Sequence, residues 1–122
     1  NLEYSVNFKV INKKEIGNFV NYPNPFSTST RFVFNLTGAI PENIVIRIMT
    51  LTGKVVKAIT SDQIGFLKIG NNITSYAWDG RDEFGNKLGN GVFLYSITTS
   101  DKEFEINSSF LSKGIGKLVI MR

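Results

Sequence analysis

The chain has 122 residues, a net charge of +4 and 42% hydrophobic residues, which suits one folded domain with its own core. It contains neither cysteine nor histidine, which excludes thiol chemistry, Cys/His zinc sites and catalysis by Cys–His or Ser–His pairs. No stretch approaches the roughly 18 apolar residues that a membrane-spanning helix needs. The chain begins with Asn1 rather than methionine, so we expect a piece of a longer protein.

Alternation of apolar and polar residues is the dominant pattern along the chain, and it predicts β-strands with one buried face. No segment carries the three-and-four spacing of an amphipathic helix over the ten or so residues that a helix needs. The residues predicted to face inward are, in chain order, Tyr4, Val6, Phe8 and Val10; Phe32, Phe34 and Leu36; Ile44, Ile46 and Ile48; Val56 and Ala58; Tyr76 and Trp78; Phe93, Tyr95 and Ile97; and Leu118 and Ile120.

Turn-forming residues separate these stretches. The sequence LTGK, residues 51–54, predicts a tight hairpin turn whose glycine adopts positive φ. Two prolines in residues 21–26 (NYPNPF) predict an extended crossing, because proline donates no hydrogen bond, and Phe26 is expected to pack under the sandwich edge. Residues 61–72 are the least regular and are expected to form a surface loop or an irregular edge.

The short strands and the turns between them predict an all-β fold, an immunoglobulin-like sandwich of about seven antiparallel strands. Residues 18–122 are expected to form this domain. Residues 1–17 are expected to be either a linker from a preceding domain or the first strand of this one, with the boundary near Gly17.

The polar loop WDGRDEFGNKLGNG, residues 78–91, offers enough acids and amides to be considered as a metal site. However, Arg81 and Lys87 place positive charges inside such a cage, and the spacing departs from the calcium-loop pattern. Nothing in the loop indicates the raised carboxyl pKa that an acid pair for glycoside hydrolysis would need. We therefore predict a structural turn, with Trp78 at the last core position and with Phe84 and Leu88 turned inward; no metal, cofactor or catalytic residue is expected.

The positive charges are scattered along the chain rather than clustered. A nucleic-acid-binding protein usually gathers its lysines and arginines on one element or face, so we expect no nucleic-acid binding. The scattered charges are typical of a soluble, basic surface. No feature of the sequence indicates a small-molecule ligand.

The end of the chain, GKLVIMR, has two interpretations. Its apolar alternation predicts an edge strand of the sandwich. Alternatively, the strand docks on a partner protein by adding to the edge of that protein's sheet. The candidate docking residues are Lys117, Leu118, Val119, Ile120, Met121 and Arg122.

Four motifs, in this order, resemble the C-terminal immunoglobulin-like domains of the bacterial type IX secretion system: YPNPFSTSTRFVFNL, IVIRIMTLTGKVVKAI, WDGRDEFGNKLGNGVFLYSI and GKLVIMR. The resemblance covers residues 18–122, and it is closest to the C-terminal domains of the PorU sortase family, which share the WDG block and the KLVI ending. The middle and late motifs are also similar to the immunoglobulin-like domain of the flagellar hook-capping protein. Residues 100–116 depart from the pattern, because the final hairpin of the family is usually shorter.

This resemblance implies a secreted or outer-membrane cell-surface protein of a Bacteroidetes-type bacterium. The PorU family consists of gingipain-like cysteine peptidases and transpeptidases, so the catalytic Cys and His would lie upstream of this chain. The chain itself would be a non-catalytic domain that docks on a PorV-like outer-membrane protein. Two alternatives stay open: a cleavable C-terminal sorting signal of a secreted cargo protein, and a carbohydrate-binding or structural module of a secreted enzyme, which would present exposed aromatics on one face.

Overall fold

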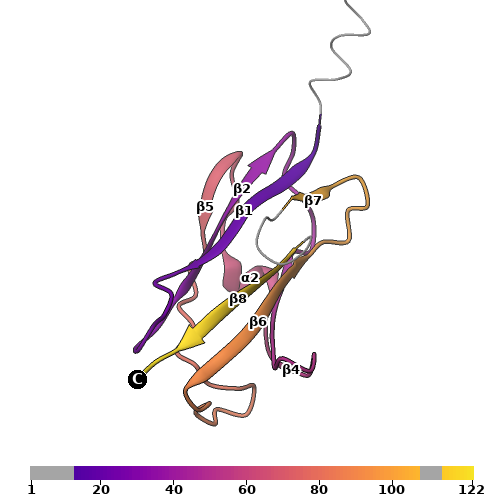
Figure 1. Ribbon diagram of the computed structural model, residues 1–122. Coiled ribbons are helices and arrows are strands. Elements are labelled where there is room, and N and C mark those ends of the chain that lie inside the picture. Colours follow the sequence, from indigo (N-terminus) through magenta and orange to yellow (C-terminus); the bar gives the residue numbers. More distant parts are fainter. Residues whose placement is uncertain (1–12, 108–113) are drawn as a thin grey trace, which may run out of the picture.

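The computed structural model describes residues 13–107 and 114–122, which form a β-sandwich (Figure 1). The strands are β1 (Glu15–Tyr22), β2 (Arg31–Thr37), β3 (Val45–Met49), β4 (Val55–Ile59), β5 (Gly70–Ile73), β6 (Gly91–Thr98), β7 (Glu105–Asn107) and β8 (Ile115–Ile120), and the short helix α2 (Ser61–Ile64) lies between β4 and β5.

The strands form two four-stranded sheets. Sheet A has the order β5-β2-β1-β7, and sheet B has the order β4-β3-β6-β8. The predicted all-β sandwich is thereby confirmed. One pairing differs from the expected antiparallel pattern, because β7 lies parallel to β1.

Regular alternation predicted the buried residues of most strands correctly. The inward side chains of β2, of β3 and of the second half of β6 are at most 2% exposed. In β8 the inward pair, Leu118 and Ile120, is equally buried. Phe26 is also buried (2% exposed), and it bridges Ile120 of β8, which confirms its expected packing under the sandwich edge.

In β4 the prediction of the inner face is only partly correct. Val56 and Ala58 were expected to face inward, and Val56 packs against the core, but the fully buried residue is Ile59, opposite Ile46. The pairing of β3 with β4 shifts register after Ile48, so one residue of β4 bulges out of the alternation. A period-two pattern carries no sign of such a shift.

Strand β1 was not predicted, because its register shifts between Gly17 and Val20 and Asn18 adopts a φ of 52°. This bulge breaks the alternation, yet it leaves Phe19 buried (1% exposed). Since β1 begins at Glu15, it runs across the boundary expected near Gly17. The strand predicted over residues 4–10 lies outside the described residues.

The segment over residues 61–72 is more regular than its sequence indicated. It contains α2, whose Ile64 is buried, and most of β5, an edge strand of sheet A. The strand predicted through Tyr76 and Trp78 is reduced to one bridge, in which the main chains of Trp78 and Thr30 exchange hydrogen bonds of 2.8 and 2.9 Å.

Aromatic rings join the two sheets at the centre of the core. The ring of Tyr95 in sheet B lies edge-on to those of Phe19 and Phe32 in sheet A, with ring centroids 4.9 and 5.2 Å apart. Gly116 makes room for Tyr95, since a Cβ at this position would come within 2.3 Å of the ring. The contact between the sheets therefore requires that residue 116 of β8 be a glycine, with no side chain to displace the Tyr95 ring.

Burial of Tyr95 predicts a loss of stability at alkaline pH. Burial raises the pKa of the Tyr95 phenol above its ordinary value, so the folded protein keeps the phenol neutral where the unfolded chain ionises it. The stabilisation is complete below about pH 10 and is lost as the pH rises through the folded-state pKa. Urea unfolding between pH 8 and pH 11 should show a steeper loss for the wild type than for Tyr95→Phe; equal slopes would contradict this account.

Candidate functional site

The six candidate docking residues lie in and directly after β8, at the edge of sheet B (Figure 1). Leu118 and Ile120 point into the core and are at most 1% exposed. Lys117 is exposed and Val119 is half-buried on the outer face, while Met121, just beyond the strand, is 62% exposed. Only the outward residues of this set can meet a partner while the sandwich stays folded.

The outer edge of β8 is already occupied by the crossing at residues 21–26. The side-chain amide of Asn24 donates to the Lys117 carbonyl and accepts from the Val119 N–H, both at 3.0 Å. Next along the edge, Phe26 donates to the Val119 carbonyl at 3.1 Å and accepts from the Met121 N–H at 2.9 Å. One amide and one residue of main chain thus take the place of a neighbouring strand, which leaves this edge closed to strand addition.

The opposite edge of sheet B is occupied in the same manner. Glu83, from the loop at residues 78–91, donates its N–H to the Val56 carbonyl at 3.1 Å, and its carboxylate accepts from the Ala58 N–H at 3.2 Å. The same carboxylate pairs with the Lys57 amine at 3.1 Å. Burial lowers the pKa of Lys57, but Glu83 and Tyr76 outweigh this effect, so the pKa lies above its ordinary value.

The loop at residues 78–91 is a structural turn, as its sequence predicted. Trp78 is fully buried, and its indole N–H donates to the Arg81 carbonyl at 2.8 Å. The Asp82 carboxylate accepts from the main-chain N–H groups of Phe84 and Asn86, which is the usual role of aspartate in turns. Phe84 is 89% exposed, so its expected inward position is wrong, whereas Leu88 does pack against the core.

Arg122 ties this loop to the end of β8. Its guanidinium donates to the main-chain carbonyls of Asp79, Gly80 and Leu88, and its own main chain exchanges hydrogen bonds with the Asn90 side chain. Gly80 adopts a φ of +82°, and a Cβ there would come within 2.3 Å of the guanidinium. The glycine in the WDG motif is therefore required for this contact.

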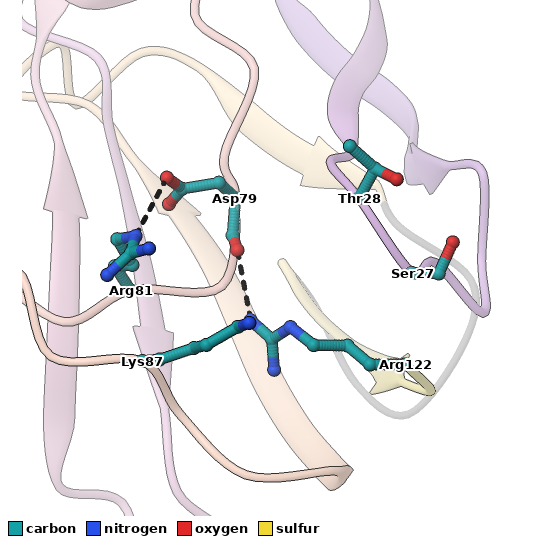
Figure 2. Close-up of a pocket in the computed structure, with 6 residues that line it drawn as sticks. All are labelled: Ser27, Thr28, Asp79, Arg81, Lys87 and Arg122. Carbon is teal, nitrogen blue, oxygen red and sulfur yellow. Dashed lines mark hydrogen bonds and ion pairs between the residues drawn. The ribbon is translucent and has the colours of Figure 1, made fainter.

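A shallow cavity of about 370 Å³ lies beside this contact (Figure 2). Arg81 pairs with Asp79 at 3.3 Å, and Arg122 is held by carbonyls, so two of the three cations at the cavity already have partners. The described residues contain no group of three acid, histidine or cysteine side chains able to hold a metal ion. The cavity thus offers neither a metal cage nor an acid pair for catalysis. Its lining residues are Ser27, Thr28, Asp79, Arg81, Lys87 and Arg122.

Sequence reasoning did not identify Asn24 and Glu83 as edge-covering residues. Their partners lie 93 to 95 and 25 residues away in the chain, so no local pattern connects them. The only available signal was the placement of Asn24 between two prolines, whose nitrogens cannot donate hydrogen bonds. Within residues 13–107 and 114–122, no helix has the length and apolarity that a membrane crossing requires.

Comparisons with known proteins bear on the fold. No protein-family model matches the chain, and no curated protein matches it in sequence. Among solved structures, the chain is similar to a crystal structure of dimeric latent PorU from Porphyromonas gingivalis, with 21% identity and a TM-score of 0.57 over 84% of this chain. The match spans 9% of the PorU chain, and it lends no support to the similarity with the flagellar hook-capping protein. The comparison therefore establishes that this β-sandwich shares its fold with a segment of PorU.

Proposed function

We propose that this chain is a non-catalytic C-terminal domain of a type IX secretion protein of the PorU sortase type, and that it docks its parent protein on the outer-membrane secretion and attachment machinery. The observation that carries the proposal is the fold shared with PorU over 84% of the chain. The four sequence motifs support it independently, because they occur in the order of the family. The expected location is the cell surface or the outer membrane.

Residue chemistry supports the non-catalytic role. With neither cysteine nor histidine, the chain cannot supply the nucleophile and base of a cysteine peptidase. In a sortase, both groups would lie in another part of the parent protein.

The docking role rests on the way β8 is held. Main-chain pairing to β6, the crossing at residues 21–26 and the Arg122 contact fix the strand on all sides except its outer face. Lys117, Val119 and Met121 are therefore presented in a fixed geometry, which lowers the entropic cost of binding. The partner that the family resemblance implies is a PorV-like outer-membrane protein.

The alternative functions are separated by different observations. A cleavable cargo signal would share this fold, and the gene upstream of Asn1 distinguishes it: a gingipain-like peptidase domain supports the sortase, and any other secreted domain supports the cargo.

A carbohydrate-binding module would need neighbouring exposed aromatics. Trp78 is fully buried and Tyr76 packs against the core, and the strongly exposed aromatics among the described residues, Tyr22, Phe66 and Phe84, lie on three separate segments of the chain.

Retention on a purified PorV-like protein from the same bacterium tests the proposal. The wild-type chain should bind, and Lys117→Glu on the outer face of sheet B should weaken binding roughly tenfold, about 1.4 kcal/mol. Arg31→Glu is the matched control, because it makes the same charge change at an exposed position of β2 in sheet A. Absence of wild-type binding would refute the docking function, and equal weakening by both variants would refute the assignment to β8.

A further inference from the structure

The outer face of sheet B carries a continuous row of aliphatic side chains. Val119 of β8 pairs directly with Val92 of β6, Leu94 of β6 with Met49 of β3, and Met49 with Val55 of β4. Val92 and Leu94 lie two residues apart on one strand, so they point to the same face. These five residues, here called the apolar band, cross all four strands of the sheet.

The apolar band is accessible to solvent. Val55 and Val92, which belong to different strands, are 47% and 38% exposed, and the other three members are half-buried among their neighbours. Single exposed aliphatic residues are common on protein surfaces, whereas large contiguous apolar patches often mark interaction sites.

The charges carried by the strands of this face are positive, and the acids beside it, Asp82 and Glu83, lie at the β4 edge. The four strands of sheet B contain three cationic residues, Arg47, Lys57 and Lys117, and no aspartate or glutamate. The amine of Lys57 is paired with Glu83 at the strand edge. Arg47 and Lys117 lie on the outer face, where Arg47 donates to the Thr98 hydroxyl at 2.8 Å. An apolar surface flanked by cations complements an apolar surface flanked by carboxylates.

A second copy of the chain is a poor occupant of this face. Each copy would bring Arg47 and Lys117 against the same pair, and the whole chain carries a net charge of +4. Strand addition at either edge is blocked as well, since Asn24 and Phe26 cover β8 and Glu83 covers β4. A partner must therefore lie across the face rather than extend the sheet.

We propose that the docking partner sits on the outer face of sheet B, and that its contact surface is an apolar patch rimmed by carboxylates. This inference rests on the proposed function and goes further, because it extends the docking site from β8 to all four strands. It also adds Val55, on the edge strand β4, and Val92, on β6, to the residues expected to contact the partner.

The experiment measures the affinity of the full chain for the same outer-membrane protein used in the retention test. Val55→Glu and Val92→Glu should each weaken binding at least tenfold, because a carboxylate would enter an apolar contact and face the partner's acids. Val20→Glu is the matched control, since Val20 is 47% exposed like Val55 but lies on β1 in sheet A. The control should bind within twofold of the wild type, and added salt should weaken wild-type binding.

The outcomes separate this inference from the proposed function. Wild-type affinity in both band variants, or an equal loss in Val20→Glu, would overturn the inference and leave the docking function standing. Absence of wild-type binding would overturn both. If a glutamate variant unfolds, Val55→Thr and Val92→Thr keep the β-branched shape while removing apolar surface, and a threefold or greater loss is expected from them; no loss would overturn the inference.

Discussion

Replacement of Trp78 with alanine is expected to lower the free energy of unfolding by about 3–5 kcal/mol. The indole is fully buried and packs against Phe26, with ring centroids 5.6 Å apart. The substitution also removes the hydrogen bond from the indole N–H to the Arg81 carbonyl. Because Trp78 is the only tryptophan, unfolding in urea should be followed by circular dichroism rather than by tryptophan fluorescence.

The same loop provides the control for this substitution. Phe84 is 89% exposed, so Phe84→Ala should change the free energy of unfolding by no more than about 0.5 kcal/mol. A Trp78→Ala variant as stable as Phe84→Ala would mean that the WDG motif does not anchor the core. The contrast tests whether the loop stabilises the fold through the burial of Trp78 rather than through its charged residues.

Removal of residues 117–122 is expected to abolish cooperative folding. The deletion takes away Leu118 and Ile120, each fully buried, and even the shortening of such a residue to alanine costs about 2–5 kcal/mol. It also removes the pairing of β8 with β6 and the Arg122 contact with the loop. Together these losses are comparable to the roughly 5–15 kcal/mol by which a domain is usually stable. Loss of near-ultraviolet circular dichroism and of a sharp thermal transition would show this.

A substitution confined to the exposed end of β8 is the control. Met121→Ser alters a side chain that is 62% exposed, so the variant should keep the thermal transition of the wild type. A deleted chain that still unfolds cooperatively would contradict the structural role of β8. If folding is lost, failure of the deleted chain to bind a partner says nothing about docking, which is why point substitutions on the outer face are needed.

The strands that alternate regularly could be predicted from sequence, and the irregular ones could not. β2 and β6 carry their buried residues at every second position. The inward set predicted for β2 is fully buried, and in β6 Tyr95 and Ile97 are buried while Phe93 is half-buried. β1 and β4 each contain a register shift, and a shift of one residue moves every later side chain to the other face. Such bulges are set by pairing with a neighbour rather than by local composition.

The candidate site could be predicted in position but not in geometry. The alternation of GKLVIMR correctly indicated an edge strand with Leu118 and Ile120 inward. The coverage of that edge by Asn24 depends on side chains and carbonyls that are more than 90 residues apart in the chain. Likewise, Arg122 binds carbonyls of the loop at residues 78–91, a contact for which charge patterning carries no signal. The apolar band emerges only when the strand order of sheet B is known.

The docking function is tested most directly by photo-cross-linking from the outer faces of the two sheets. A photoreactive residue would replace Val92 in sheet B or, as the control, Val20 in sheet A, in the full-length parent protein on intact cells. Capture of a PorV-like outer-membrane protein from position 92 but not from position 20, identified by mass spectrometry, is the expected result. Capture from position 20 alone, or from neither position, would contradict docking through the face of sheet B.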